Sequence, residues 1–230
     1  MTVISPVAVP MDVPPYRLSG SVYGALLNHR SALDALGTRV DDAPYRGAPR
    51  APVLYIKPRN TLAVSGAPVR VPPDAPELEV GACLGLVLGR AAARLAEEEA
   101  LEYVAGYLLV NDVSVPQASW YRPATSAQAR DGFCPLGPRV VPRAALADPA
   151  ALTLKVFVDG ALRQSARCAD LVRPAARLLA EVSEFMTLAA GDVLALGAAF
   201  PAPRVRAGQV VRIEADGIGC LENPFVAEAA

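Results

Sequence analysis

Short apolar runs separated by Pro/Gly-rich breaks recur along this chain, a pattern typical of a protein built from short strands. The runs predict strands at residues 20–27, 53–57, 79–88, 104–113, 192–196 and 210–214. Residues 152–158 and 162–165 flank Asp159-Gly160, a pair favoured in two-residue hairpin turns. Helical spacing of apolar residues predicts helices at 28–36, 91–103 and 174–188. Strands therefore dominate, and we expect a β-rich α+β fold.

The length of 230 residues fits one large domain or two small ones. Residues 1–17 are rich in proline and lack periodicity, so we interpret them as an N-terminal arm. Residues 18–230 contain no internal repeat and no evident linker, which predicts a single domain. An apolar fraction of 53% with 20% charged residues argues against disorder.

Charge and cysteine usage exclude several classes of function. The net charge of −1 gives no reason to expect binding to nucleic acid or to an anionic membrane. No apolar run is long enough to span a bilayer. None of the four cysteines forms a CxxC pair, which argues against a zinc site or a disulfide framework and favours a reducing cytoplasm; they are Cys83, Cys134, Cys168 and Cys220.

The best candidate for chemistry is Asp112, which ends the apolar run YVAGYLLVND at residues 103–112. A Gly/Pro-rich segment, DGFCPLGP at 131–138, then returns the backbone toward it. A carboxylate at the end of a buried strand costs free energy unless a metal or a polar group pairs with it. The alternative is structural, because such an acid also caps turns by accepting backbone N–H groups.

Several motifs together resemble the fumarylacetoacetate hydrolase superfamily over residues 18–226. They are YIKPRNTL (55–62), LGLVLGR (84–90), YVAGYLLVND (103–112), DGFCPLGP (131–138), VDG (158–160) and AAGDVLALG (189–197). Further segments look like one branch of it, the bifunctional decarboxylase/isomerases of 4-hydroxyphenylacetate (homoprotocatechuate) breakdown. These segments are NHRSALDAL (28–36), KPRNT (57–61), NDVS (111–114), YRP (121–123), RDGFCPLGP (130–138) and LENP (221–224).

The resemblance implies a fumarylacetoacetase C-terminal-domain-like mixed β-sheet roll with few helices. It also implies Mg²⁺ held by three carboxylates, which stabilises an enolate as CO₂ leaves, and a positioned acid/base that moves a proton. The expected substrates are 5-oxopent-3-ene-1,2,5-tricarboxylate and its product 2-hydroxyhepta-2,4-diene-1,7-dioate. Such proteins have two homologous halves, fused or separate. This chain has the length of one half and resembles the N-terminal one, so we expect a homodimer or a hetero-oligomer with a paralogous subunit.

This chain departs from the metal motif of the family. Asp112 matches the third ligand. Glu77 and Glu79 are two residues apart, a spacing that places both side chains on the same face of a strand. Counted back from residues 88–90, however, the family glutamates fall at Gly81 and Cys83, four residues later, or about 13 Å of strand. Only a bulge or an insertion would bring Glu77 and Glu79 to Asp112. Otherwise the two glutamates are a solvated strand start.

Other active-site positions of the family have changed too. The catalytic histidine position is Ala32, and His29, the single histidine, is interpreted as structural. The family lysine is Gln128, the arginine after the ligand aspartate is Pro116, and a Gly-Thr-Pro loop is replaced by residues 197–199. Two hypotheses follow. Either the chain is an active decarboxylase/isomerase with Asp112 as its catalytic residue, or it is a degenerate structural partner of a metal-bearing paralogue. A third, hydrolysis of acylpyruvates, is disfavoured by the missing histidine.

Basic residues near these motifs suit a dicarboxylate or tricarboxylate keto-acid, because arginine pairs bidentately with carboxylates. The candidate substrate-binding residues are Lys57, Arg59, Arg122, Arg130 and Asp131. The alternative for Arg130 and Asp131 is an internal ion pair that fixes their loop. Cys134, before a proline in a turn, is interpreted as a packing residue rather than a nucleophile.

Overall fold

The computed structural model describes residues 21–121 and 124–228, which form three β-sheets. The largest has seven strands in the order β2-β1-β11-β6-β7-β8-β3. It is mixed, because β1 runs parallel to β11 and β3 parallel to β8, while the other neighbours are antiparallel. Its strands are β1 (Val22–Leu26), β2 (Val53–Lys57), β3 (Leu62–Val64), β6 (Ala82–Leu88), β7 (Val104–Asn111), β8 (Cys134–Pro142) and β11 (Val193–Ala195).

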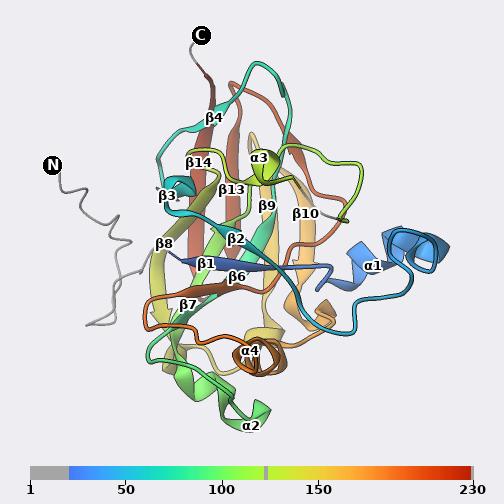
Figure 1. Ribbon diagram of the computed structural model, residues 1–230. Coiled ribbons are helices and arrows are strands. Elements are labelled where there is room, and N and C mark those ends of the chain that lie inside the picture. Colours follow the sequence, from blue (N-terminus) through green and yellow to red (C-terminus); the bar gives the residue numbers. More distant parts are fainter. Residues whose placement is uncertain (1–20, 122–123, 229–230) are drawn as a thin grey trace, which may run out of the picture.

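A second sheet packs beside it with the order β10-β9-β13-β14-β4, and β12 pairs with β5 in a small third sheet (Figure 1). The predicted hairpin joins β9 to β10 through Asp159 and Gly160, both at positive φ as the two-residue turn requires. The strands are β4 (Val69–Val71), β5 (Leu78–Glu79), β9 (Thr153–Val158), β10 (Ala161–Arg167), β12 (Arg204–Val205), β13 (Val210–Ala215) and β14 (Gly219–Ala227).

Helices are few and short in the described residues. They are α1 (Arg30–Leu36), α2 (Glu97–Ala100), α3 (Thr125–Gln128) and α4 (Ala175–Ser183). Six 3₁₀ turns accompany them: η1 (Gly37–Val40), η2 (Arg59–Thr61), η3 (Leu101–Tyr103), η4 (Arg143–Ala145), η5 (Pro149–Ala151) and η6 (Cys168–Asp170). In Figure 1, α2 and α4 lie below the sheets, whereas α1 and the loop after it project to one side.

The prediction of a helix over 91–103 is wrong in its first half, because helical structure begins only at Glu97. The backbone before it is used in tertiary hydrogen bonds instead. Ala92 pairs with Leu188, and the amides of Arg94 and Leu95 donate to the carbonyl and hydroxyl oxygens of Ser183. The same contacts end α4 at Ser183, earlier than the predicted boundary at 188. Apolar spacing identified the buried face here, but long-range pairing decided the backbone conformation.

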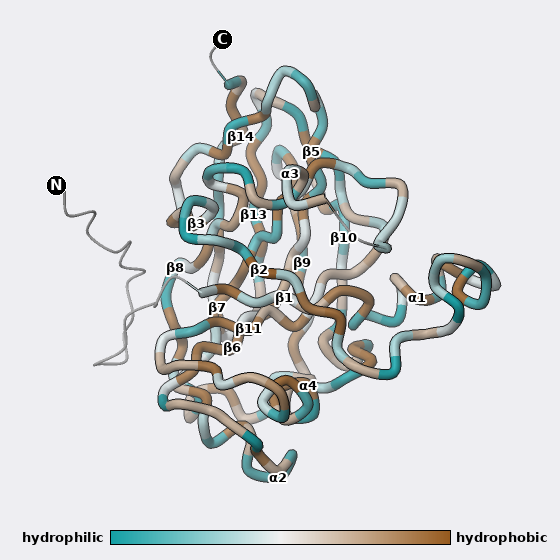
Figure 2. The backbone as a smooth tube through the Cα atoms, in the orientation of Figure 1, coloured by the Kyte–Doolittle hydropathy of each residue, from teal (hydrophilic) through white to brown (hydrophobic). Residues whose placement is uncertain are grey.

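The β-rich α+β prediction is confirmed, and the core lies between the sheets. Every residue of β6 is buried, and β7 is buried at all positions except Ala105. Figure 2 shows the apolar residues concentrated on these central strands and the polar ones on the loops. Within the described residues, no helix is long and apolar enough to cross a bilayer. The N-terminal arm at 1–17 lies outside the described residues, and the single domain over 18–230 stays a prediction.

Candidate active site

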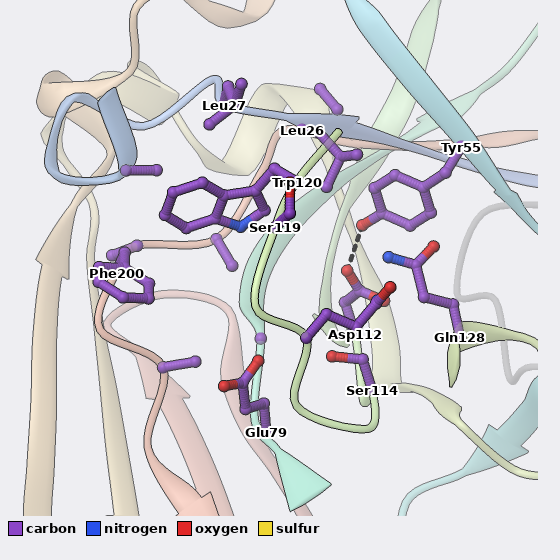
Figure 3. Close-up of a pocket in the computed structure, with 17 residues that line it drawn as sticks. Leu26, Leu27, Tyr55, Glu79, Asp112, Ser114, Ser119, Trp120, Gln128 and Phe200 are labelled. Atoms are coloured by element: carbon purple, nitrogen blue, oxygen red, sulfur yellow. Dashed lines mark hydrogen bonds between the residues drawn. The ribbon is translucent and has the colours of Figure 1, made fainter. Parts of the chain in front are cut away.

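Asp112 directly follows the buried strand β7, and its side chain is only 13% exposed. One carboxylate oxygen, Oδ1, lies 2.7 Å from the ammonium of Lys57. The other, Oδ2, accepts a hydrogen bond from the phenol of Tyr55 (Figure 3). Burial raises the pKa of Tyr55 well above its usual range, and the Asp112 charge raises it further. The phenol therefore stays protonated and acts as the donor to the carboxylate.

Lys57 is fully buried at the end of β2, with a side-chain exposure of 1%. Its ammonium donates to the carbonyl oxygens of Val113, Gln128 and Phe133 at 2.7, 2.9 and 3.2 Å. These three acceptors match its three N–H groups, so the ammonium meets Asp112 as an ion pair beside a complete carbonyl cage. Lys57 thus ties the loop after β7 to β2 and supplies the positive charge that the buried carboxylate needs.

A cavity of about 90 Å³ opens in front of Asp112. In Figure 3, Tyr55, Asp112 and Gln128 gather on one side of it and Trp120 and Phe200 on the other. The lining contains two carboxylates but no lysine, arginine or histidine of the described residues; its polar members are Tyr55, Glu79, Asp112, Ser114, Gln117, Ser119 and Gln128. The interior of this cavity is therefore suited to neutral or cationic groups rather than to carboxylates.

Gly81 forms the floor of the cavity beside Asp112. The Asp112 amide donates to the Gly81 carbonyl at 2.8 Å, so the two backbones are tightly paired. A Cβ at position 81 would lie 2.6 Å from the Asp112 carbonyl oxygen, closer than real contacts allow. Glycine is needed at 81 because of this close approach, and any side chain there would require the backbone to move.

A family model described as "Fumarylacetoacetate (FAA) hydrolase C-terminal" matches residues 21–226. The chain belongs to the fumarylacetoacetate hydrolase family. It is 44% identical over 211 residues to a 4-hydroxyphenylacetate degradation bifunctional isomerase/decarboxylase of Salmonella dublin, a match covering 92% of this chain and 48% of that protein. The chain thus spans about half the length of the curated relatives it matches. That it corresponds to the N-terminal half stays a prediction.

Solved structures of the fumarylacetoacetate hydrolase family agree with this fold. The chain is 30% identical, with a TM-score of 0.77, to 5-carboxymethyl-2-hydroxymuconate delta-isomerase from Mycobacterium smegmatis, covering 95% of this chain and 82% of that one. It is 27% identical, with a TM-score of 0.76, to maleylpyruvate hydrolase from Sphingobium, solved in complex with manganese(II) and pyruvate, covering 91% and 71%. The predicted mixed-sheet fold of this family is confirmed.

The cavity collects five of the positions at which this chain departs from the family pattern. Ala32, at the expected catalytic-histidine position, and Gln128, at the expected lysine position, both line it. So do Gly81, at an expected metal ligand, and Ala198 and Ala199 of the altered loop. The cavity is therefore where the family's active-site chemistry is expected, and these five positions carry no ionisable side chain. His29 instead caps α1, where its Nδ1 accepts from the Ser31 amide, so its interpretation as structural is confirmed.

The residues present do not fit an octahedral Mg²⁺ or Mn²⁺ held by three carboxylates. Both oxygens of Asp112 already face Lys57 or Tyr55. Gly81 has no donor atom, and Cys83 is a fully buried thiol whose pKa is raised well above its usual range by burial, whereas these hard cations prefer oxygen ligands. Within residues 21–121 and 124–228, no three His, Cys, Asp or Glu side chains group in a way that suits an ion.

The structure separates the predicted metal set of Asp112, Glu77 and Glu79. Glu79 lines the cavity with Asp112. The strand is interrupted between β5 and β6, and Glu79 at the end of β5 forms a β-bridge with Ser114. Glu77 instead forms ion pairs with Arg206 and Arg204, at 2.6 and 3.4 Å, and is absent from the cavity lining. The prediction that all three hold one ion is therefore wrong for the described residues, because no register shift carries Glu77 inward.

The predicted substrate-binding residues do not share a site either. Lys57 lies in its buried carbonyl cage, and Arg59 is exposed on η2. Arg130 pairs bidentately with Asp74 at 2.8 and 2.9 Å, so the alternative of an Arg130–Asp131 pair is wrong. Asp131 accepts from Asn60 at 2.7 Å, and both it and Arg130 line a different pocket. Arg122 lies outside the described residues.

Sequence reasoning missed Tyr55, which completes the pairing of Asp112. The signal was present, because Tyr55 and Lys57 are two residues apart in one strand and so point to the same face. Trp120, the single tryptophan, also gave no pattern, because it lies in an irregular loop whose position depends on contacts with Tyr45.

Two buried thiols predict a loss of stability at high pH. Burial raises the pKa of Cys134 to about 12 and that of Cys168 to about 11. Thiols of the unfolded chain titrate near about 8.5. The folded state holds these protons longer, so its stability is complete below that pH and falls as the pH rises toward 11–12. Urea unfolding at several pH values measures this. Cys134→Ala should flatten the decline; identical slopes for variant and parent would contradict the prediction.

Proposed function

We propose that this chain is a subunit of a decarboxylase/isomerase for 5-oxopent-3-ene-1,2,5-tricarboxylate and 2-hydroxyhepta-2,4-diene-1,7-dioate, in which a paralogous, metal-bearing subunit carries out the metal-dependent chemistry. The substrates are those that the resemblance to this branch implies, and the isomerase/decarboxylase names of the relatives support them. The chain's own part is to keep the fold and complete the assembly.

The observation that carries the proposal is the state of Asp112. In this chain an ammonium from its own core, Lys57, already neutralises the carboxylate. Ala32 and Gln128, at the positions where the family has its base and its cation, offer neither.

The cations that pair with the two carboxylates of the cavity, Lys57 with Asp112 and Arg204 with Glu79, do not line it. A tricarboxylate entering the cavity would therefore find no free cation to pair with among the described residues that line it, which is electrostatically unfavourable. The alternative, in which Asp112 is a catalytic base here, is disfavoured because Lys57 and Tyr55 already occupy its two carboxylate oxygens.

Reconstitution tests the proposal. The isolated chain, its metal-bearing homologous subunit and their mixture are assayed for decarboxylation with and without Mg²⁺. We expect the isolated chain to be inactive in both conditions and the mixture to need Mg²⁺. Gln128→Ala in this chain should leave the activity of the mixture within about twofold, because only the backbone of Gln128 holds Lys57.

Full Mg²⁺-dependent activity of the isolated chain would overturn the proposal and restore the first hypothesis. In that case Asp112→Ala should abolish the activity. A mixture whose activity equals that of the homologous subunit alone, without co-migration on a sizing column, would show that the two do not assemble.

A further inference from the structure

A groove of about 690 Å³ lies next to the Asp112 cavity, between the loop at residues 45–50, the start of β2 and the loop at 120–121. Leu27 and Trp120 line both spaces, so the groove and the cavity adjoin. Its volume is in the range of pockets that take small organic molecules. It is therefore large enough for a ligand that the cavity of about 90 Å³ does not hold.

Two arginines give this groove a positive charge. Arg46 and Arg50 line it, and no acidic side chain of the described residues does so. Neither guanidinium has an ion pair or hydrogen bond within the described part of the chain. Many other arginines are paired; Arg130, Arg173 and Arg206 each meet a carboxylate at 2.8 Å or less. The donors of Arg46 and Arg50 are thus available for an anion, and guanidinium geometry suits a carboxylate.

The groove also has an aromatic wall that is held in place. The Tyr45 hydroxyl lies 2.9 Å from Ser119 Oγ and accepts a hydrogen bond from the Trp120 amide at 3.1 Å. The rings of Tyr45 and Tyr121 meet edge to face at 6.0 Å, and Trp120 packs against Phe200 in the same way at 5.0 Å. These contacts tie the two loops together and present flat apolar surface, which favours a planar ligand body.

We propose that this groove binds a small organic acid, with its carboxylate on Arg46 and Arg50 and a planar conjugated body against the aromatic wall. The charge pattern sets its orientation. Both arginines line the groove, whereas Glu79 and Asp112 line the adjoining cavity, so the carboxylate stays in the groove and an uncharged portion points toward the cavity past Trp120. The continuity with the cavity favours a free acid over an acidic protein segment as the occupant. This site goes beyond the proposed function, because it assigns the chain a ligand of its own.

Binding is tested on the isolated full-length chain with cis,cis-muconate, a conjugated dicarboxylate, as the probe. Calorimetry gives the affinity, and the fluorescence of Trp120, the single tryptophan, reports occupancy of the groove. We expect Arg46→Gln and Arg50→Gln each to weaken binding about tenfold, the loss of one charge-assisted hydrogen bond. Arg139→Gln, at an exposed arginine outside the groove, is the matched control and should not change the affinity.

The dimethyl ester of the same acid separates charge recognition from apolar contact and should bind at least about tenfold more weakly. The proposal is overturned if muconate does not bind, if the ester binds equally well, or if the two groove variants behave like the Arg139 control. Binding of an acidic peptide in place of muconate would also overturn it and make the groove a protein-docking surface. Because the assay needs no partner subunit and no turnover, failure of the reconstitution experiment leaves its result unaffected.

Discussion

Replacing Lys57 with methionine is expected to lower the free energy of unfolding by about 3–5 kcal/mol, the usual cost of removing one partner of a buried ion pair. Methionine preserves most of the apolar stem but leaves the Asp112 carboxylate without its cation. The carbonyls of Val113, Gln128 and Phe133 also lose their shared donor. Urea denaturation followed by circular dichroism measures the change.

Two further variants make this result specific. Arg130→Met removes the cation of a partly exposed bidentate pair with Asp74 and should cost far less, because water replaces the lost contact. Lys57→Met combined with Asp112→Asn removes both buried charges and should recover part of the stability. If Lys57→Met costs no more than Arg130→Met, the buried pair does not have the structural role assigned to it.

Gly24→Ala is expected to destabilise the protein by about 3 kcal/mol and to disturb the site at the same time. Gly24 of β1 pairs with Tyr55 of β2, and a Cβ at this position would overlap the Tyr55 ring. The ring has to move, and the hydrogen bond from its phenol to Asp112 is then lost. The stability change is measured by urea denaturation, and the titration of the phenol by its ultraviolet absorbance.

A double-mutant cycle tests whether the clash is the cause. In a Tyr55→Ala background the added methyl group of Gly24→Ala has room, so its cost should fall well below that in the parent protein. Equal costs in the two backgrounds would place the strain elsewhere along β1. In the parent, the phenol should titrate well above its ordinary pKa, and Gly24→Ala should bring it back toward that value.

These variants bear on one feature, a carboxylate whose counter-charge belongs to the fold. Lys57 is held by carbonyls from the loop after β7, so the cation cannot leave as a bound ion would. Removal of added divalent metal should therefore leave the stability of this chain unchanged. The separation of charges, with carboxylates inside the cavity and arginines on the groove outside, follows from the same arrangement.

The sequence by itself determined the family, most of the strands and the place of Asp112. The motifs are contiguous, and alternation or continuity of apolar residues reports which face a strand buries. The hairpin at Asp159-Gly160 was predictable because the turn is local and its positive φ values restrict the residues. Asp112 stood out because a charge at the end of the buried strand β7 needs a partner.

Only the tertiary structure decided what that partner is. Tyr55 and Lys57 lie on β2, at the edge of the sheet, and strands β1, β11 and β6 separate β2 from β7. Their meeting with Asp112 depends on the fold of the loop after β7, which no local pattern encodes. The same holds for Glu79, which reaches the cavity while Glu77 does not, and for the arginines of the groove. Residues far apart in the chain meet according to packing and register, and the periodicity of apolar residues shows which face is buried but not which distant residues meet there.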